Sequence, residues 1–132
     1  MPDRYVLTLH TALASNTGGP FTATWDRVVV PATGTLRMVS AVARSLASNA
    51  RTNSVDIFAQ ADAPAAGSNT ATSVLVDPIT LVNDLDSASG TIRESGARVA
   101  AGSMLELRTY ADNVGSQPAF LGLTATIVIE AD

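Results

Sequence analysis

The chain has 132 residues, a net charge of −4, one histidine and neither cysteine nor lysine. This length allows one domain, expected to span residues 1–132, and the missing residues exclude a disulfide framework, a cysteine-ligated zinc site and a lysine nucleophile. The acidic balance and the scattered arginines argue against nucleic acid as a partner, because affinity for phosphates comes from basic patches.

Apolar and polar residues alternate with a period of two, which predicts strands rather than helices. Near the N-terminus, Tyr5, Leu7 and Leu9 share one face, and near the C-terminus Leu123, Ala125 and Ile127 do so. Clusters of Gly, Pro and Asn separate most of the alternating segments, as turns require. Eight strands are expected, at about residues 4–10, 23–30, 35–44, 54–60, 73–82, 90–95, 103–111 and 120–130.

Two of these segments are ambiguous. Residues 38–46 also place Val39, Val42 and Leu46 on one side of a short helix, although the valines and the preceding Gly-Thr favour a strand. Pro78 interrupts the segment 73–82, which indicates an edge position, a bulge or two short strands. Apolar residues are also expected on outer strand faces, namely Val39, Ala41, Phe58 and Val128.

Eight short strands in one small domain predict an all-β, antiparallel, two-sheet sandwich, most simply a jelly roll. In that topology the loops 11–22, 45–53, 83–89 and 112–119 fall at one end of the sandwich. This end is rich in Asn and Ser, has Arg44 and Arg51 nearby, and is the expected contact surface.

The sequence offers little catalytic chemistry, and we expect no enzymatic activity. His10 has no Gly-x-Ser-x-Gly nucleophile near it and is expected to be a partly exposed residue of a strand or a turn. Glu94 and Glu106 would be candidate paired carboxylates if they were cross-strand neighbours, but Arg93 and Arg108 could equally pair with them. No cofactor is expected.

Metal binding has one weak candidate. Residues 83–87 begin with the alternating oxygen ligands of a calcium loop, but Ser89 and Ser95 stand where such a loop needs Gly and an acid. A turn with Asx hydrogen bonds is the favoured interpretation, and a looser calcium site between two loops is left open.

Aromatic residues are few and are mostly expected to fill the core or an interface. Trp25, which opens a strand, is the best candidate for ligand contact, and Phe58 is expected to contact a partner or a ligand. No apolar stretch approaches the length of a membrane span, and the N-terminal residues lack the basic start and apolar stretch of a signal peptide, so we expect synthesis in a cytoplasm. A lean core without disulfides favours oligomerisation as a further source of stability.

Two segments resemble a known family. Residues 100–108, a Gly/Pro turn and residues 121–129 are similar to the closing strand pair of small jelly-roll proteins from the virions of tailed bacteriophages. Residues 25–36 (WDRVVVPATGTL) are similar to their early strand-turn-strand. The resemblance implies a virion structural protein without catalytic residues.

Within that family the resemblance favours a trimeric capsid decoration (cement) protein on the capsid surface, whose partner is the major capsid protein. The alternative is a fibre tip or a carbohydrate-binding jelly-roll module, in which exposed aromatic residues led by Trp25 would stack on sugars.

Overall fold

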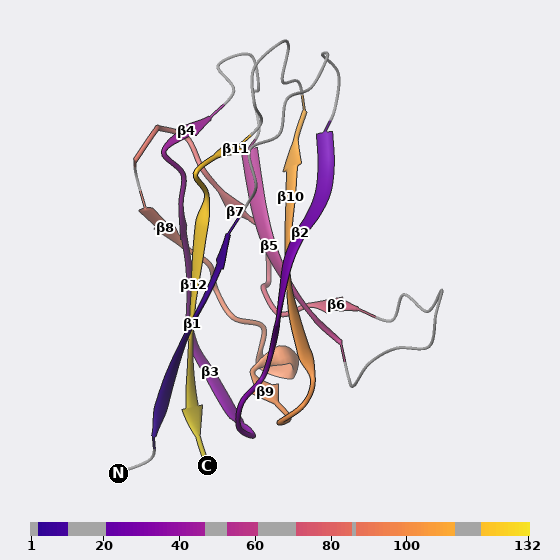
Figure 1. Cartoon of the computed structure of the whole chain (residues 1–132). Helices are drawn as coiled ribbons and strands as arrows, with labels where there is room; N and C mark the ends of the chain where they lie inside the picture. The colour runs from indigo at the N-terminus through magenta and orange to yellow at the C-terminus, as the bar shows by residue number, and fades with distance from the viewer. Residues whose placement is uncertain (1–2, 11–20, 47–52, 61–70, 86, 113–119) are drawn as a thin grey trace.

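The structure is a computed structural model, and the part of the chain that it describes contains twelve strands (Figure 1). The described residues are 3–10, 21–46, 53–60, 71–85, 87–112 and 120–132, with only the backbone described for 21–25 and 120–121. No α-helix occurs in these ranges. The strands form two main antiparallel sheets that face each other, which confirms the predicted all-β sandwich.

The first sheet has the order β1-β12-β3-β8. β9 also pairs with β3, at the start of that strand, whereas β8 pairs with its end. The facing sheet has the order β2-β10-β5-β6, with β7 also pairing with β5, and β4 and β11 form a separate two-stranded ribbon. The elements in chain order are β1 (Arg4–His10), β2 (Phe21–Val29), β3 (Gly34–Val42), β4 (Ser45–Leu46), β5 (Asn53–Gln60), β6 (Thr72–Ser73), β7 (Ile79–Thr80), β8 (Ser87–Ser89), a 3-10 turn η1 (Glu94–Gly96), β9 (Arg98–Val99), β10 (Met104–Ala111), β11 (Phe120–Leu121) and β12 (Thr124–Ala131).

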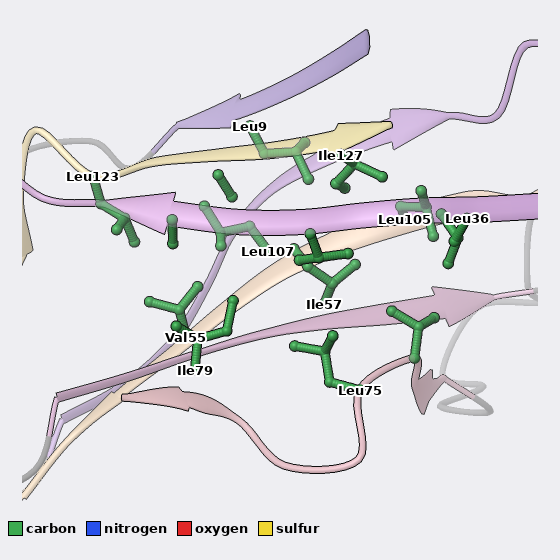
Figure 2. Packing of buried hydrophobic residues seen from close by; sticks show 14 of the residues in the cluster. Leu9, Leu36, Val55, Ile57, Leu75, Ile79, Leu105, Leu107, Leu123 and Ile127 are labelled. Carbon is green, nitrogen blue, oxygen red and sulfur yellow. The ribbon is translucent and has the colours of Figure 1, made fainter. Parts of the chain in front are cut away.

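The core lies between the two sheets, where inward side chains from both sheets meet (Figure 2). Alternation puts every second residue of a strand on this inner face, so the predicted apolar faces of β1, β5, β10 and β12 are the buried ones. Full burial of one such aliphatic side chain contributes about 1.5–3 kcal/mol. The largest fully buried apolar side chains are Leu9, Val30, Val39, Ile57, Leu75, Leu105, Leu107, Leu123, Ile127 and Ile129.

A bulge in β3 overturns one prediction about the outer surface. The register of β3 against β12 shifts between Val128 and Ile129, so that Arg37 has no residue directly opposite it on β12. One extra residue reverses which alternate positions face inward. Val39 and Ala41 were expected outside and are buried in the core, whereas Phe58 and Val128 lie on outer faces as predicted.

The segments 73–82 and 90–95 are not the continuous strands that the sequence predicts. Only β6 and β7 form around Pro78, and residues 90–95 contribute a single bridge, Ile92 to Leu75, before η1 begins. Proline cannot donate a ladder hydrogen bond, and here it separates two short pairings with β5. Likewise, the expected strand 120–130 is divided at Gly122, whose φ of 64° ends β11.

The start of β3 can be tested through Gly34, which is flanked by β12 on one side and β9 on the other. A Cβ at this position would overlap the backbone carbonyl oxygen of Glu130. Gly34→Ala is therefore expected to lower the free energy of unfolding by about 2–3 kcal/mol, as overpacking against a rigid backbone does. The control is Gly102→Ala, where φ is 87° but no atom lies near, with an expected cost of about 1 kcal/mol. Equal shifts of the two urea midpoints would contradict this account of the β3 contact.

Candidate functional site

A fully buried carboxylate lies on the outer face of the β2-β10-β5 sheet. Glu106 is in the central strand β10 between Leu105 and Leu107, which both point into the core, so its own side chain points outward. Its exposed fraction is nevertheless 0%. A buried charge is costly unless it is paired and hydrogen-bonded, so the side chains that cover Glu106 must also neutralise it.

Two arginines and one amide surround this carboxylate. Arg27 of β2, directly opposite Glu106, donates from Nε to Oε1 at 2.7 Å. Arg108, two residues along β10, donates from Nε and Nη2 to Oε2 at 3.1 and 2.8 Å. Gln60 of β5 donates from Nε2 to Oε1 at 2.9 Å. We call Glu106, Arg27, Arg108 and Gln60 the carboxylate clamp.

Phe58 of β5 supports the clamp. It lies opposite Glu106 on the other side of β10, and the guanidinium carbon of Arg108 is 4.0 Å from the centre of its ring. This is a cation–π contact, worth about 0.5–1 kcal/mol where the pair is partly exposed. Phe58, predicted as a ligand contact, thus carries Arg108 on its ring and helps to orient it toward Glu106.

Next to the clamp a shallow groove of about 240 Å³ follows the seam between β5 and β10. Arg108 lies opposite Asp56 and Tyr110 lies opposite Ser54, and Pro78 closes the groove from the segment before β7. The groove therefore combines an exposed aromatic ring, a guanidinium, a carboxylate and a hydroxyl.

Asp56 is fixed on its outer β5 position by two hydrogen bonds. The hydroxyl of Ser73 donates to Oδ1 at 2.6 Å, and the backbone N–H of Ile57 donates to the same oxygen at 2.8 Å. Burial raises the pKa of Asp56, and the hydrogen bonds and the charges of Arg93 and Arg108 offset that effect only in part. The carboxylate thus pays a desolvation cost at neutral pH.

The other predicted contact residues are not gathered at this groove. Arg44 is exposed between β3 and β4, beside Gly122, and is not among the residues that line the groove. Trp25 lies in β2 at a register shift against β10, and its side chain is outside the described residues. Arg51 also lies outside them.

The sequence-based candidates for catalysis are separated. Glu94 is in η1 and Glu106 in β10, so they are not cross-strand neighbours, and the guanidinium of Arg93 donates to the carbonyl oxygen of Leu75. His10 is exposed at the end of β1, as predicted, with Nδ1 3.2 Å from the hydroxyl of Thr124.

Asp84 lies in a turn, but the hydrogen bond that its side chain accepts comes from a distant strand and is not an Asx hydrogen bond within the turn. Its Oδ1 accepts the backbone N–H of Leu46 at 2.9 Å, and the next residue, Leu85, has a φ of 64°. Within the described ranges, no three His, Asp or Glu side chains gather as a metal site would need.

Sequence reasoning missed Arg27, Gln60, Asp56 and Tyr110 as members of one surface. The available signal was the outward position of Glu106 between two inward leucines, Leu105 and Leu107. Strand pairing, which brings β2 and β5 to either side of β10, was needed to identify the partners.

Comparison of the chain with protein-family models, with curated proteins and with solved structures finds no match. Among the described residues there is also no helix that is long and apolar enough to cross a membrane.

The clamp predicts an order of stability among arginine variants. Arg108→Ala removes two hydrogen bonds from a carboxylate with no exposed surface and leaves Phe58 uncovered, so an unfolding cost of about 2–3 kcal/mol is expected. Arg27→Ala, whose side chain is 59% exposed, should cost about 1 kcal/mol. The matched control is Arg37→Ala, which breaks an exposed pair with Glu130 and should cost at most about 0.5 kcal/mol. Chemical denaturation measures all three, and an Arg108→Ala cost no larger than the Arg37→Ala cost would refute the clamp.

The raised pKa of Asp56 predicts a pH dependence with a defined sign. The native state holds the Asp56 proton more tightly than the unfolded state, so this group lowers stability as the pH rises above its ordinary pKa of 3.8. Asp56→Asn keeps an oxygen for Ser73 and Ile57 but cannot ionise. The stability of Asp56→Asn relative to the parent should therefore increase from about pH 3 to about pH 7 in urea titrations. A difference that stays constant over that range would contradict the assignment.

Proposed function

We propose that this chain is a jelly-roll virion structural protein, of the capsid decoration type, that forms trimers and binds between capsid subunits. Two arguments support the proposal: the nesting of the strand pairs, and the character of the outer face of the β1-β12-β3 sheet.

The strand pairing has the form of one long antiparallel ribbon wound around a core. The twelve strands can be grouped into eight strand positions. In this grouping β4 extends β3 and β11 extends β12, β6 and β7 share one position, and β8 and β9 share another. In that count the first position pairs with the last, the second with the seventh, the third with the sixth and the fourth with the fifth. Such nested pairing, folded into two sheets, is the arrangement we propose as a jelly roll.

The outer side chains of β1, β12 and β3, which we call the β12 face, suit a protein contact. Val6, Val128 and Met38 form one row across the three strands, with Val6 64% exposed and Met38 39% exposed. The next row is Thr8, Thr126 and Ser40. These two rows contain no charged side chain, and the first row is apolar. Cores of protein interfaces are likewise poor in charged residues and rich in apolar ones.

Charged groups lie at one border of the β12 face. Glu130 receives hydrogen bonds from Arg4 and Arg37, and these contacts lower the pKa of its carboxyl. Arg98 and Asp132 form a further pair, through two nitrogens and two oxygens. An uncharged centre with a charged border is the observation that carries the proposal, because it matches the anatomy of interfaces between subunits.

A decoration protein acts mechanically. Several copies in one assembly attach to neighbouring capsid subunits, so individually weak contacts add through effective concentration and resist outward pressure on the shell. The loop end that carries Arg44 is the part we propose against the capsid.

The oligomeric state tests the β12 face. The parent chain is expected to be a trimer by light scattering, whereas Val6→Lys should be largely monomeric, because the interface would bury an unpaired charge in an apolar row. Val82→Lys serves as the control, since Val82 is 78% exposed on the segment between β7 and β8. Matching melting temperatures would show that both variants fold.

Attachment tests the function itself. The trimer should sediment with undecorated heads assembled from the major capsid protein of the same virus, and should raise the temperature at which those heads open. A monomeric parent chain that does not sediment with the heads would overturn the proposal.

A further inference from the structure

The groove between β5 and β10 has an unused acceptor. Both hydrogen bonds to the Asp56 carboxylate, from Ser73 and Ile57, end on Oδ1, and within the described residues none ends on Oδ2. The carboxylate is nevertheless half-buried and held in place. Oδ2 can therefore accept a hydrogen bond from a ligand without giving up one from the protein.

The guanidinium of Arg108 is held equally firmly beside Asp56. It lies against the ring of Phe58 and donates two hydrogen bonds to Glu106, so its position does not depend on a ligand. A fixed carboxylate and a fixed guanidinium on opposite strands provide acceptor and donor groups without further ordering of side chains.

An aromatic ring and a proline complete the groove. Tyr110, the next outward residue after Arg108 on β10, is 39% exposed and borders the groove opposite Ser54. Pro78 lines it from the neighbouring segment. These two side chains offer flat apolar surface about 7 Å along the strand from the charged row, given a rise of about 3.4 Å per residue.

The charges decide what class of ligand fits. A cation would approach Asp56 against the positive charges of Arg93 and Arg108, which both act on that carboxylate. An anion near Arg108 would meet the carboxylate of Asp56 opposite it and the carboxylate of Glu106 that Arg108 already binds. A neutral ligand avoids both repulsions, and it needs hydroxyl donors near Asp56 and an apolar face toward Tyr110.

We propose that this groove binds one neutral hexopyranose unit of a glycan. Its C–H face would lie on the Tyr110 ring, and a ring hydroxyl would donate to Oδ2 of Asp56. This site lies on the opposite sheet from the β12 face, so glycan binding and self-association would use separate surfaces. The proposal does not depend on the virion role.

The site differs from the one that the sequence suggested. Phe58 was expected to be a partner or ligand contact, but its ring is in contact with Arg108. In this proposal, Phe58 positions Arg108, and Tyr110 supplies the stacking surface.

A glycan array tests the proposal. The glycans are displayed in many copies, because a single shallow contact is expected to be weak, with a dissociation constant near the millimolar range, which corresponds to a binding free energy of about −4 kcal/mol. The array carries neutral hexopyranosides together with sialylated and sulfated glycans. The parent chain should bind one or more neutral hexopyranosides and should not prefer the anionic glycans. Absence of binding to every neutral glycan, or a preference for anionic ones, would overturn the assignment.

Variants then locate the binding. Tyr110→Ala and Asp56→Asn should each weaken binding at least about tenfold, the size of one lost stacking contact or charge-assisted hydrogen bond. Tyr110→Phe keeps the ring and should bind within about twofold of the parent, a small fraction of one stacking contact. Val82→Ala, outside the groove, is the control for unaltered binding. Binding that survives Tyr110→Ala in a folded variant would place the site elsewhere.

Discussion

The outer face of the β2-β10-β5 sheet depends on the neutralisation of one carboxylate. Glu106 has no exposed surface, so Arg27, Arg108 and Gln60 must approach from three strands to satisfy it. That requirement fixes Arg108 over the ring of Phe58 and so determines the wall of the adjacent groove. Buried ion pairs are weak contributors to net stability. The clamp therefore matters chiefly because it holds the charges of this face in one arrangement.

The inner faces of the sandwich were predictable, because they follow from a period of two and a preference for aliphatic residues. Leu105 and Leu107 in β10, and Ala125, Ile127 and Ile129 in β12, are buried as the alternation predicts. The prediction was wrong at Val39 and Ala41, because the bulge at Arg37 depends on how β3 pairs with β12. Such a register shift has no local signature in alternating residues.

The candidate groove could be predicted only in part. An outward Glu106 beside Arg108 was visible in the alternation of β10, and Phe58 was expected on an outer face. The partners Arg27 and Gln60 come from strands far apart in the sequence, 79 and 46 residues from Glu106, and only the sheet order brings them together. The residues around Asp56 alternate as in any half-buried strand, so the sequence does not mark it. Its carboxylate is fixed by a hydrogen bond from Ser73 of β6, which the sequence does not predict.

The outer faces of the two sheets differ in where their charged side chains lie. On the β12 face, the ion pairs of Glu130 and Asp132 lie at a border. The rest of the face consists of rows of Val, Met, Thr and Ser side chains that run across the three strands. On the opposite sheet, charges occupy the centre, where Glu106, Arg108 and Asp56 lie on adjacent strands. An uncharged surface suits a large protein contact, since no charge needs a partner when water is excluded. A surface with fixed central charges suits a small polar ligand that can satisfy them one by one.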